Sequence, residues 1–324
     1  MPFRVMASAR NVQMVLDQFK QRLDAAGVEI FFPQSAAPTL SEAELLAQLP
    51  GCIAAIAMPD DYTASVIKAA SPALRLIARS GVGYDSIDLD AAAEHNVWVT
   101  TTVGANHDAV ADYAMGLMLD LARHITEIVT RVRGGWWGRL PGAELRGKTL
   151  GIVGTGRIGR EVAARAAGFG MRLVAYDKFP NEDWARGAAV TYASLDDLLA
   201  QADFITLHAP ATAETRHLLN DQTLARAKRG VCVVNTARGD LIDEAALVRA
   251  LDSGQVAGAA LDVFESEPPT DAQRAVMGHA KVLPLSHCAG ATLESQRRAA
   301  EIALEQVLEA VRGDTPRFVV PELA

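Results

Sequence analysis

Residues 149–177 read TLGIVGTGRIGREVAARAAGFGMRLVAYD, and this stretch decides the fold of the chain around it. Its first apolar run, Leu150–Val153, predicts a buried strand. An amphipathic helical pattern follows from Ile158 to about Gly168, and a second apolar run ends at Asp177. The order of strand, glycine-rich turn, helix and strand predicts two parallel strands joined by a helix.

Three glycines in this stretch, Gly154, Gly156 and Gly159, have the spacing G-x-G-x-x-G. The first permits a tight turn, the second lets the backbone approach a pyrophosphate, and the third allows the helix to pack closely on the strand. The amino terminus of the helix offers N–H groups and a positive dipole to phosphates. Because all the parts occur in order, they indicate a dinucleotide site rather than a merely structural turn.

Asp177 follows the second strand of this unit, 18 residues after Gly159. A carboxylate there can accept hydrogen bonds from the hydroxyls of the adenosine ribose. It would also repel a 2′-phosphate, so the sequence favours NAD over NADP. Lys178 weakens this preference slightly.

Composition and charge restrict the class of protein. The chain has 324 residues, of which 22% are charged, and a net charge of −8. This length is enough for two domains, and the negative charge argues against binding to nucleic acid or to anionic membranes. We find neither a signal-peptide core nor an apolar run of membrane-spanning length. Three widely spaced cysteines, Cys52, Cys232 and Cys288, favour a reducing compartment over a disulfide framework, so we expect a cytoplasmic protein.

Residues 3–100 alternate short apolar runs with helical patterns, which predicts a parallel sheet with helices on both faces. The expected strands are Arg4–Ala7, Val28–Phe31, Ile53–Ala57, Arg75–Ala78 and Val97–Thr100. Strand–helix alternation resumes at 149 and continues to about 285, and a final helix is expected near 293–312.

A long apolar helical pattern at about 106–132 predicts one helix, followed by the loop Gly134-Gly135-Trp136-Trp137-Gly138. The pattern is longer and more apolar than a simple surface helix requires, and the two tryptophans need burial. We therefore expect a homodimer that uses this helix and loop.

Further polar motifs stand at the predicted strand ends, where open α/β sheets bind ligands. They are ARSGVGYDSIDLD (78–90), LHAP (207–210), VNTARGDLIDE (234–244), LDVFESEPP (261–269) and SHCAGAT (286–292). Together with GTGRIG and its downstream acid, these ordered motifs resemble the D-isomer-specific 2-hydroxyacid dehydrogenases over nearly the whole chain. The resemblance implies two doubly wound parallel-sheet α/β domains with the active site in a cleft between them. The Rossmann NAD-binding domain would be 103–290, and the flavodoxin-like substrate domain would be 1–102 with 291–324.

The family's catalytic arginine, glutamate and histidine correspond to Arg238, Glu267 and His287. An imidazole titrates near neutral pH and can take or give the proton of the substrate hydroxyl. Glu267 would orient this ring and stabilise its charged form, and Arg238 would bind the carboxylate and the C2 oxygen. Each residue also has an alternative structural role. Arg238 could cap a helix or form an ion pair, Glu267 could be a solvated acid in a turn, and His287 could be a histidine of the core.

The resemblance also implies binding roles. The cofactor residues would be Gly154, Gly156, Arg157, Ile158, Gly159, Asp177, His208, Pro210, Thr215, Thr236, Ala237, Arg238, Asp262, His287, Ala289 and Gly290. The substrate residues would be Arg79, Val82, Gly83, Arg238 and His287. Asp262 is expected to bind the nicotinamide carboxamide, and the N–H groups of Val82 and Gly83 are expected to bind the substrate carboxylate.

Two positions depart from the usual family pattern. Ser286 replaces the proline that often precedes the catalytic histidine, and Cys288 follows the histidine where isoleucine is often found. A thiol so near the nicotinamide ring could make activity sensitive to oxidation, but an inert buried cysteine is the favoured alternative.

The substrate is less defined than the family. Arg79 precedes SGVG as in the phosphoglycerate dehydrogenases of this family, where a second cation would suit a second anionic group; it could instead pair with a nearby acid. A D-3-phosphoglycerate dehydrogenase-like activity is therefore expected, with a glyoxylate, hydroxypyruvate or other 2-keto-acid reductase as the alternative. A dinucleotide-sensing corepressor ranks below both. No Cys/His cluster has zinc-ligand spacing, so no metal is expected.

Overall fold

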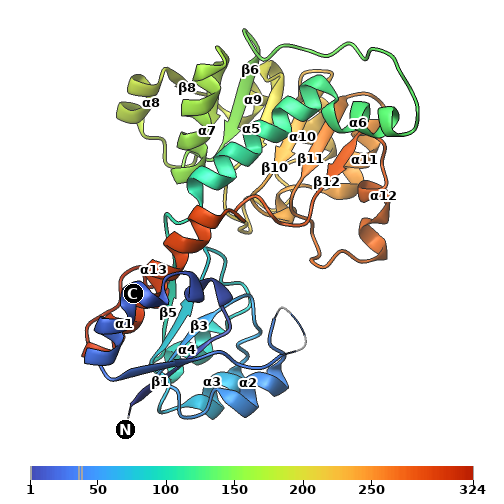
Figure 1. Ribbon diagram of the computed structural model, residues 1–324. Coiled ribbons are helices and arrows are strands. Elements are labelled where there is room, and N and C mark those ends of the chain that lie inside the picture. The colour runs from blue at the N-terminus through green and yellow to red at the C-terminus, as the bar shows by residue number, and fades with distance from the viewer. Residues whose placement is uncertain (1, 36, 38, 324) are drawn as a thin grey trace. The chain divides into compact units, whose positions relative to one another are not determined.

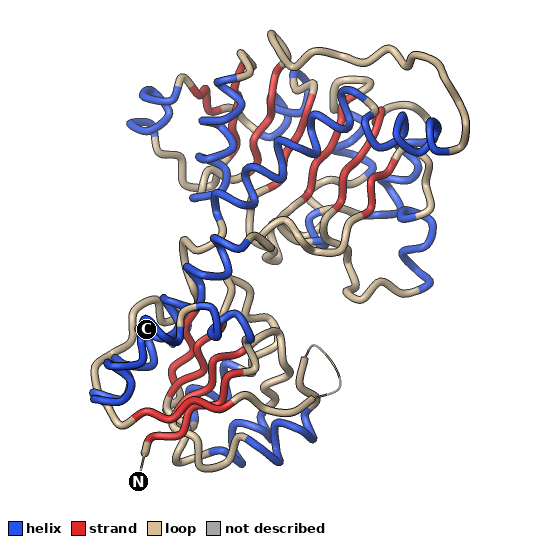
Figure 2. The backbone as a smooth tube through the Cα atoms, in the orientation of Figure 1, coloured by secondary structure: helices blue, strands red, loops and turns tan. Residues whose placement is uncertain are grey.

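The computed structural model describes residues 2–35, 37 and 39–323, and its internal contacts divide the chain into two compact units (Figures 1 and 2). The first unit contains Met1–Asn106 and Ala291–Ala324, and the second contains His107–Gly290. Among the described residues, no helix combines the length and the apolar character needed to span a membrane.

The first unit is built on a parallel sheet with the strand order β2-β1-β3-β4-β5 within its described residues. The strands are β1 (Phe3–Ala7), β2 (Val28–Phe31), β3 (Ala54–Ala57), β4 (Leu76–Arg79) and β5 (Trp98–Thr101). The helices are α1 (Leu16–Ala25), α2 (Glu42–Gln48), α3 (Ala64–Ala70), α4 (Leu89–Glu94) and α13 (Leu293–Arg312). This order is that of a flavodoxin-like doubly wound sheet.

The side chains of each strand point alternately to the two faces of the sheet, and this unit therefore has two cores. Val5 packs with α1 and α13 on one face of the sheet, and Met6 packs with α2, α3 and α4 on the other. Successive side chains of a strand point to opposite faces, so strands covered on both sides must be apolar at nearly every position. This explains why β3 reads AAIA with every residue buried.

The second unit is built on a longer parallel sheet with the described order β12-β11-β10-β9-β6-β7-β8. The strands are β6 (Thr149–Val153), β7 (Arg172–Tyr176), β8 (Val190–Tyr192), β9 (Phe204–Leu207), β10 (Val231–Asn235), β11 (Val256–Leu261) and β12 (Val282–Pro284). The helices are α5 (His107–Arg123), α6 (Ile125–Arg133), α7 (Arg157–Gly168), α8 (Glu182–Ala188), α9 (Leu195–Gln201), α10 (Asp221–Arg226), α11 (Glu244–Asp252) and α12 (Arg274–Met277). Helices α5 and α7 cover one face, and α9, α10 and α11 cover the other. The predicted fold class of two doubly wound parallel sheets is confirmed.

The winding direction of the second sheet reverses between β6 and β9, which are hydrogen-bonded neighbours. Ligands of such sheets bind outside the carboxyl ends of the strands at this point. The loops that follow β6 and β9 meet there so closely that a Cβ atom on Gly154 would lie 2.7 Å from the carbonyl carbon of His208. Gly154 also has a φ of +92°, so glycine is required for both reasons.

The prediction of one continuous helix over 106–132 is wrong. The chain forms α5 and then α6, with a break at His124, which has the left-handed φ of +55°. The carboxylate of Asp120 accepts a hydrogen bond from the backbone N–H of Thr126 at 2.8 Å and another from the Thr126 hydroxyl. These bonds satisfy the start of α6 and so stabilise a new helix after the break.

Candidate active site

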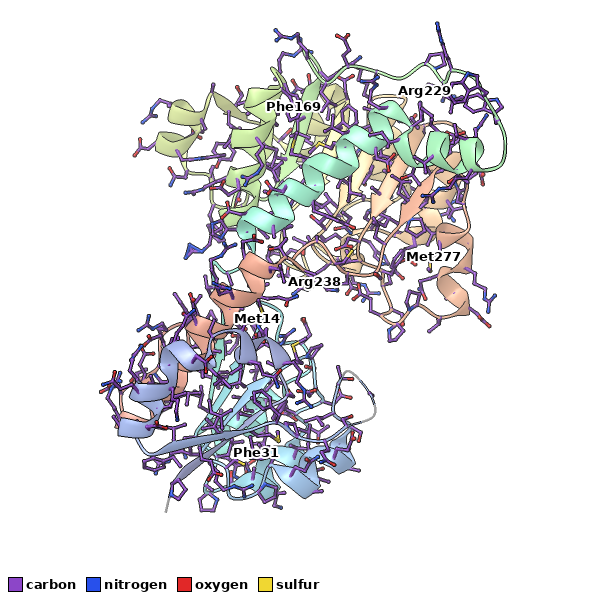
Figure 3. The ribbon with its side chains drawn as sticks, viewed as in Figure 1. Met14, Phe31, Phe169, Arg229, Arg238 and Met277 are labelled. Carbon is purple, nitrogen blue, oxygen red and sulfur yellow. The ribbon has the colours of Figure 1, made fainter. Side chains whose placement is uncertain are left out.

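The three predicted catalytic residues follow three neighbouring strands of the second unit. Arg238 follows β10, Glu267 lies beyond β11, and His287 lies beyond β12. Because the carboxyl ends of parallel strands lie on the same edge of a sheet, the three loops are adjacent. Figure 3 labels Arg238, just beyond the end of β10.

A hydrogen bond joins two of these residues. Nδ1 of His287 lies 2.6 Å from Oε2 of Glu267, and the other carboxylate oxygen, Oε1, accepts the N–H of Phe264 at 3.1 Å. The hydrogen bond to Glu267 raises the pKa of His287; burial and the charge of Arg238 oppose this rise, whereas the charges of Glu267 and Asp262 add to it. Burial alone would raise the pKa of Glu267, but its contacts with His287, Phe264 and Arg238 lower it. The pair is therefore tuned toward an imidazolium beside a carboxylate.

Asp262 holds the backbone around the histidine. It is 1% exposed, and its two carboxylate oxygens accept the N–H groups of Cys288 at 2.9 Å and Ala289 at 2.8 Å. The N–H of His287 donates to the carbonyl of Asp262 at 2.8 Å. His287 itself has a φ of +55°, a costly conformation for a residue with a Cβ atom. These contacts to Asp262 therefore stabilise the backbone conformation that places the imidazole.

The thiol of Cys288 is part of the same cluster. Its Sγ lies 3.0 Å from the hydroxyl oxygen of Tyr113 on α5 and donates to Oδ1 of Asp262 at 3.5 Å. Burial raises the pKa of Tyr113, so this phenol stays protonated near neutral pH. Cys288 and Cys232 are half-buried, whereas Cys52 is buried.

A compact turn positions Arg238. Asn235 donates from its side-chain amide to the carbonyl of Arg238 at 2.8 Å and accepts the N–H of Ala237 at 3.0 Å. A Cβ atom on Gly239 would lie 1.9 Å from the carbonyl carbon of Phe264. Only glycine permits the loop after β10 to approach the loop that carries Glu267 this closely.

Asp177 is held at the end of β7 by its neighbours. Oδ2 accepts the N–H of Thr155 at 2.6 Å and its hydroxyl at 2.9 Å, and Oδ1 accepts the N–H of Phe179 at 2.8 Å. Burial alone would raise the pKa of Asp177, but these hydrogen bonds and the charge of Arg160 lower it. The hydroxyl of Tyr192 lies 2.7 Å from that of Thr155 and extends the network. The carboxylate is thus ionised and fixed in place.

The residues near the carboxyl ends of β6 and β9, where the winding direction reverses, fit a bound dinucleotide. A Cβ atom on Gly156 would meet nothing within 4 Å, so its backbone is open to a ligand, and α7 begins there without a side-chain cap. A Cβ atom on Gly159 would lie 2.0 Å from the carbonyl oxygen of Gly154, which keeps the helix close to the turn. Among the described residues, Thr236 Oγ1 and His208 Nδ1 are buried polar atoms without a hydrogen-bond partner. Such atoms are expected where a polar ligand supplies the partner.

The loop after β9 contains the other predicted cofactor residues. Nε2 of His208 lies 2.8 Å from the hydroxyl of Thr206, and burial lowers the pKa of His208 to about 3. His208 is therefore neutral near pH 7, which fits a binding residue rather than an acid or base. The hydroxyl of Thr215 donates to the carbonyl of Pro210 at 2.6 Å and closes the loop.

The predicted substrate residues Arg79, Val82 and Gly83 lie in the first unit, where Arg79 ends β4. Arg79 donates from Nη1 to the carbonyl of Ser80 at 2.7 Å, and Val82 is 38% exposed. A Cβ atom on Gly81 would lie 2.7 Å from Nη1 of Arg79, so glycine leaves room for the guanidinium over the loop.

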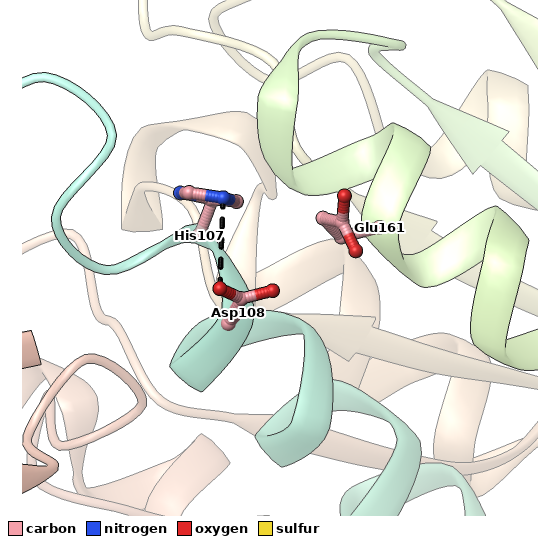
Figure 4. A group of neighbouring side chains, drawn as sticks. All are labelled: His107, Asp108 and Glu161. Atoms are coloured by element: carbon pink, nitrogen blue, oxygen red, sulfur yellow. Dashed lines mark ion pairs between the residues drawn. The ribbon is translucent and has the colours of Figure 1, made fainter. Parts of the chain in front are cut away.

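Two other features of the second unit involve residues that were not predicted for the site. A cavity of about 580 Å³ is lined partly by Thr149 and Arg172, which begin β6 and β7, so it is at the amino ends of the strands. His107, Asp108 and Glu161 place potential metal-ligand atoms within 4.8 Å of one another (Figure 4). Arg165 pairs with Asp108 at 3.2 Å and with Glu161 at 2.7 Å, so both carboxylates already belong to an ion-pair network.

Comparisons with known proteins agree with this geometry. The sequence profile of the family described as "D-isomer specific 2-hydroxyacid dehydrogenase, NAD binding domain" matches residues 115–289. The D-3-phosphoglycerate dehydrogenase of Rattus norvegicus is 44% identical over 284 residues, which are 87% of this chain and 53% of that protein. The hydroxypyruvate reductase of Thermotoga maritima is 45% identical over 250 residues, which are 76% of this chain and 80% of that protein.

The fold is also similar to solved structures of this family. The D-lactate dehydrogenase of Aquifex aeolicus, in complex with NAD and lactic acid, has a TM-score of 0.82 and 29% identity and covers 96% of each chain. The chain belongs to the D-isomer-specific 2-hydroxyacid dehydrogenase family. It spans about half the length of the phosphoglycerate dehydrogenases that it matches.

Several supporting residues of the site are not evident from the sequence. Asn235 and Thr155 lie within the motifs NTARGD and GTGRIG, and they fix Arg238 and Asp177 respectively. Tyr113 and Tyr192 lie outside the quoted motifs, and no local pattern relates them to the site. Their positions depend on packing between segments that are distant in the sequence.

Substitution of Gly239 by alanine tests the close approach of the two catalytic loops. The added methyl group would overlap the backbone of Phe264, so the loop with Glu267 must move away from Arg238. A displacement of about 1 Å at a reacting site costs on the order of 100-fold in rate, and we expect a loss of this size in turnover at this site. Gly187→Ala, at a helical position with nothing within 4 Å, is the matched control. Parental turnover in folded Gly239→Ala would contradict the assignment.

Proposed function

We propose that this chain is an NAD-dependent oxidoreductase that interconverts a D-2-hydroxy acid and a 2-keto acid. The observation that carries the proposal is the 2.6 Å contact between His287 and Glu267, with the charge of Arg238 acting on both groups. When bound, the nicotinamide exchanges a hydride with C2 of the substrate. The second unit would bind the dinucleotide. The N–H groups of Val82 and Gly83 would bind the substrate carboxylate, and Arg79 would suit a second anionic group.

The protein side chains would handle the proton and the charge. In reduction, His287 as the imidazolium would give its proton to the oxygen on C2, and in oxidation the neutral ring would take it. Glu267 would keep the ring oriented and stabilise its charged form, as the raised pKa of His287 supports. Arg238 would bind the substrate carboxylate and stabilise the negative charge that develops on the C2 oxygen.

The substrate class we favour is D-3-phosphoglycerate, because relatives with that name are 40–44% identical to this chain. Glyoxylate and hydroxypyruvate are the alternatives, supported by reductases with those substrates in their names at 38% and 45% identity. Three free cysteines suit a reducing compartment, and we propose a cytoplasmic location.

A panel of 2-keto and 2-hydroxy acids with NADH or NAD tests this function. It should include 3-phosphohydroxypyruvate, hydroxypyruvate, glyoxylate and pyruvate, with D-3-phosphoglycerate in the oxidative direction. We expect turnover with at least one, and a loss on the order of 100-fold or more in kcat for His287→Ala, which removes the proton donor. Arg238→Ala should damage both KM and kcat, because its charge acts on bound substrate and on the developing alkoxide. No turnover with any acid, together with retained NADH binding, would instead favour a dinucleotide-sensing protein.

Asp177→Ala tests the cofactor preference. The parent should use NADH better than NADPH, because the ionised carboxylate accepts ribose hydroxyls and repels a 2′-phosphate. The variant should bind NADH more weakly and discriminate less against NADPH. The measurement is kcat/KM for each cofactor with the best acid of the panel. Equal values in the parent would show that Asp177 does not select the cofactor.

We propose a homodimer that uses α6 and the tryptophan loop, residues 134–138. Helix α6 has no buried residue; Ile125, Val129 and Val132 are 49%, 41% and 41% exposed, and Trp137 is 91% exposed. Large apolar side chains exposed in one segment of a chain commonly mark a protein–protein contact. Sedimentation at micromolar concentration should show a dimer, and Val129→Glu should weaken it. A monomeric parent would contradict this proposal.

A further inference from the structure

Glu244 is a buried carboxylate in the second unit with no role in the chemistry described above. It is the first residue of α11 and is 8% exposed, and burial raises its pKa. The helix does not need it as a cap, because the side chain of Asp243 accepts the N–H of Ala246 at 2.9 Å. A buried carboxylate is costly unless it is hydrogen-bonded, so its partners indicate what it does.

The hydrogen bond that Glu244 accepts comes from a residue two positions before Glu267. Oε1 of Glu244 accepts the N–H of Glu265 at 2.9 Å. The side chain of Gln273, which is buried, acts on the same carboxylate and opposes the rise in its pKa. Oε1 of Gln273 is occupied, since it accepts the N–H of Thr270 at 3.1 Å and its hydroxyl at 2.8 Å. The amide nitrogen of Gln273 is therefore the side-chain group left to act on Glu244.

Glu265 and Glu267 lie in a segment, residues 262–270, that has no regular secondary structure. Its conformation depends on individual hydrogen bonds, among them the bond from the N–H of Phe264 to Glu267. Glu265 is also held through its side chain, 2.8 Å from Nε2 of His217. A movement of this segment would change the 2.6 Å contact between Glu267 and His287.

We propose that Glu244 is a positioning residue: its carboxylate holds the segment around Glu267 through the N–H of Glu265 and so keeps Glu267 hydrogen-bonded to His287. The kinetic part of this inference rests on the proposed dehydrogenase function. Glu244 acts through hydrogen bonds to the segment and not through its charge. This distinguishes it from Glu267, Asp262 and Arg238, whose charges act on His287 directly. The charged groups that act on Glu244 are Glu265 and Asp240.

Two substitutions of Glu244 separate the position of its side-chain oxygen from its charge. Glu244→Gln removes the charge but keeps an oxygen at the same distance from the backbone. Glu244→Asp keeps the charge but withdraws the oxygens by one methylene group. If the contact matters, the aspartate variant should lower kcat by about 10-fold to 100-fold, the range for a small misplacement at a reacting site. It should also lower the midpoint of the His287 ring titration, followed by NMR, whereas the glutamine variant should retain most of the parental rate and midpoint.

A control variant separates positioning from general stability. Asp203 is a half-buried acid of the same unit that binds the N–H of Thr149 at 2.8 Å and the ammonium of Lys228 at 2.7 Å. Asp203→Asn should lower thermal stability and leave the His287 titration unchanged.

The outcomes are distinct. A parental midpoint in Glu244→Asp, a larger loss in Glu244→Gln than in Glu244→Asp, or equal losses in both would overturn the positioning role. If the parent enzyme turns over no acid of the panel, the proposed function fails. The ring titration requires no substrate and still decides whether Glu244 positions Glu267.

Discussion

The parallel pairing of β10, β11 and β12 is the constraint on which the site of the second unit depends. Because the strands run in one direction, the loops that follow them lie along one edge of the sheet. Residues separated by tens of positions in the sequence thereby become neighbours. Gly239 permits contact between the first two loops, and the hydrogen bond from His287 to Glu267 joins the last two. Removal of either contact would leave the same strands without the same chemistry.

A second feature of the site is that its charges are held by backbone groups. Asp262 accepts two N–H groups, Asp177 accepts two, and Glu267 accepts one. Backbone groups cannot move far when the fold is intact, so the carboxylates are oriented before any ligand arrives. Preorganised dipoles of this kind reduce the reorganisation that a charged transition state requires.

The sequence predicted the parts of this arrangement that have a local cause. The glycine spacing follows from the turn itself, the strands follow from their apolar runs, and Arg238, Glu267 and His287 stand within motifs whose family resemblance assigns them roles. The break at His124 was missed because the apolar pattern continues across it. What ends α5 there is a left-handed residue together with the side chain of Asp120, and apolar periodicity carries no information about either.

The supporting contacts of the site were missed for a different reason. Asp262 binds the backbone of residues 26 and 27 positions downstream, and Glu244 binds a backbone group 21 positions away. Such distances are set by how the strands pair, and a single sequence does not encode them in its spacing. Tyr113 lies on α5, near the start of the second unit, and contacts Cys288, which is 175 residues further along the chain.

The hydrogen bond and the charge of Glu267 keep His287 protonated to higher pH than is usual for an imidazole. The most direct measurement is the titration of the His287 ring by NMR in the parent and in Glu267→Gln. The raised pKa of His287 means that the ring holds its proton to higher pH, and the parent should therefore reduce keto acids to higher pH. Without the carboxylate charge, the midpoint should move to lower pH, and the reductive pH profile should move with it. An unchanged midpoint in Glu267→Gln would show that Glu267 is a turn acid and that another group tunes the histidine.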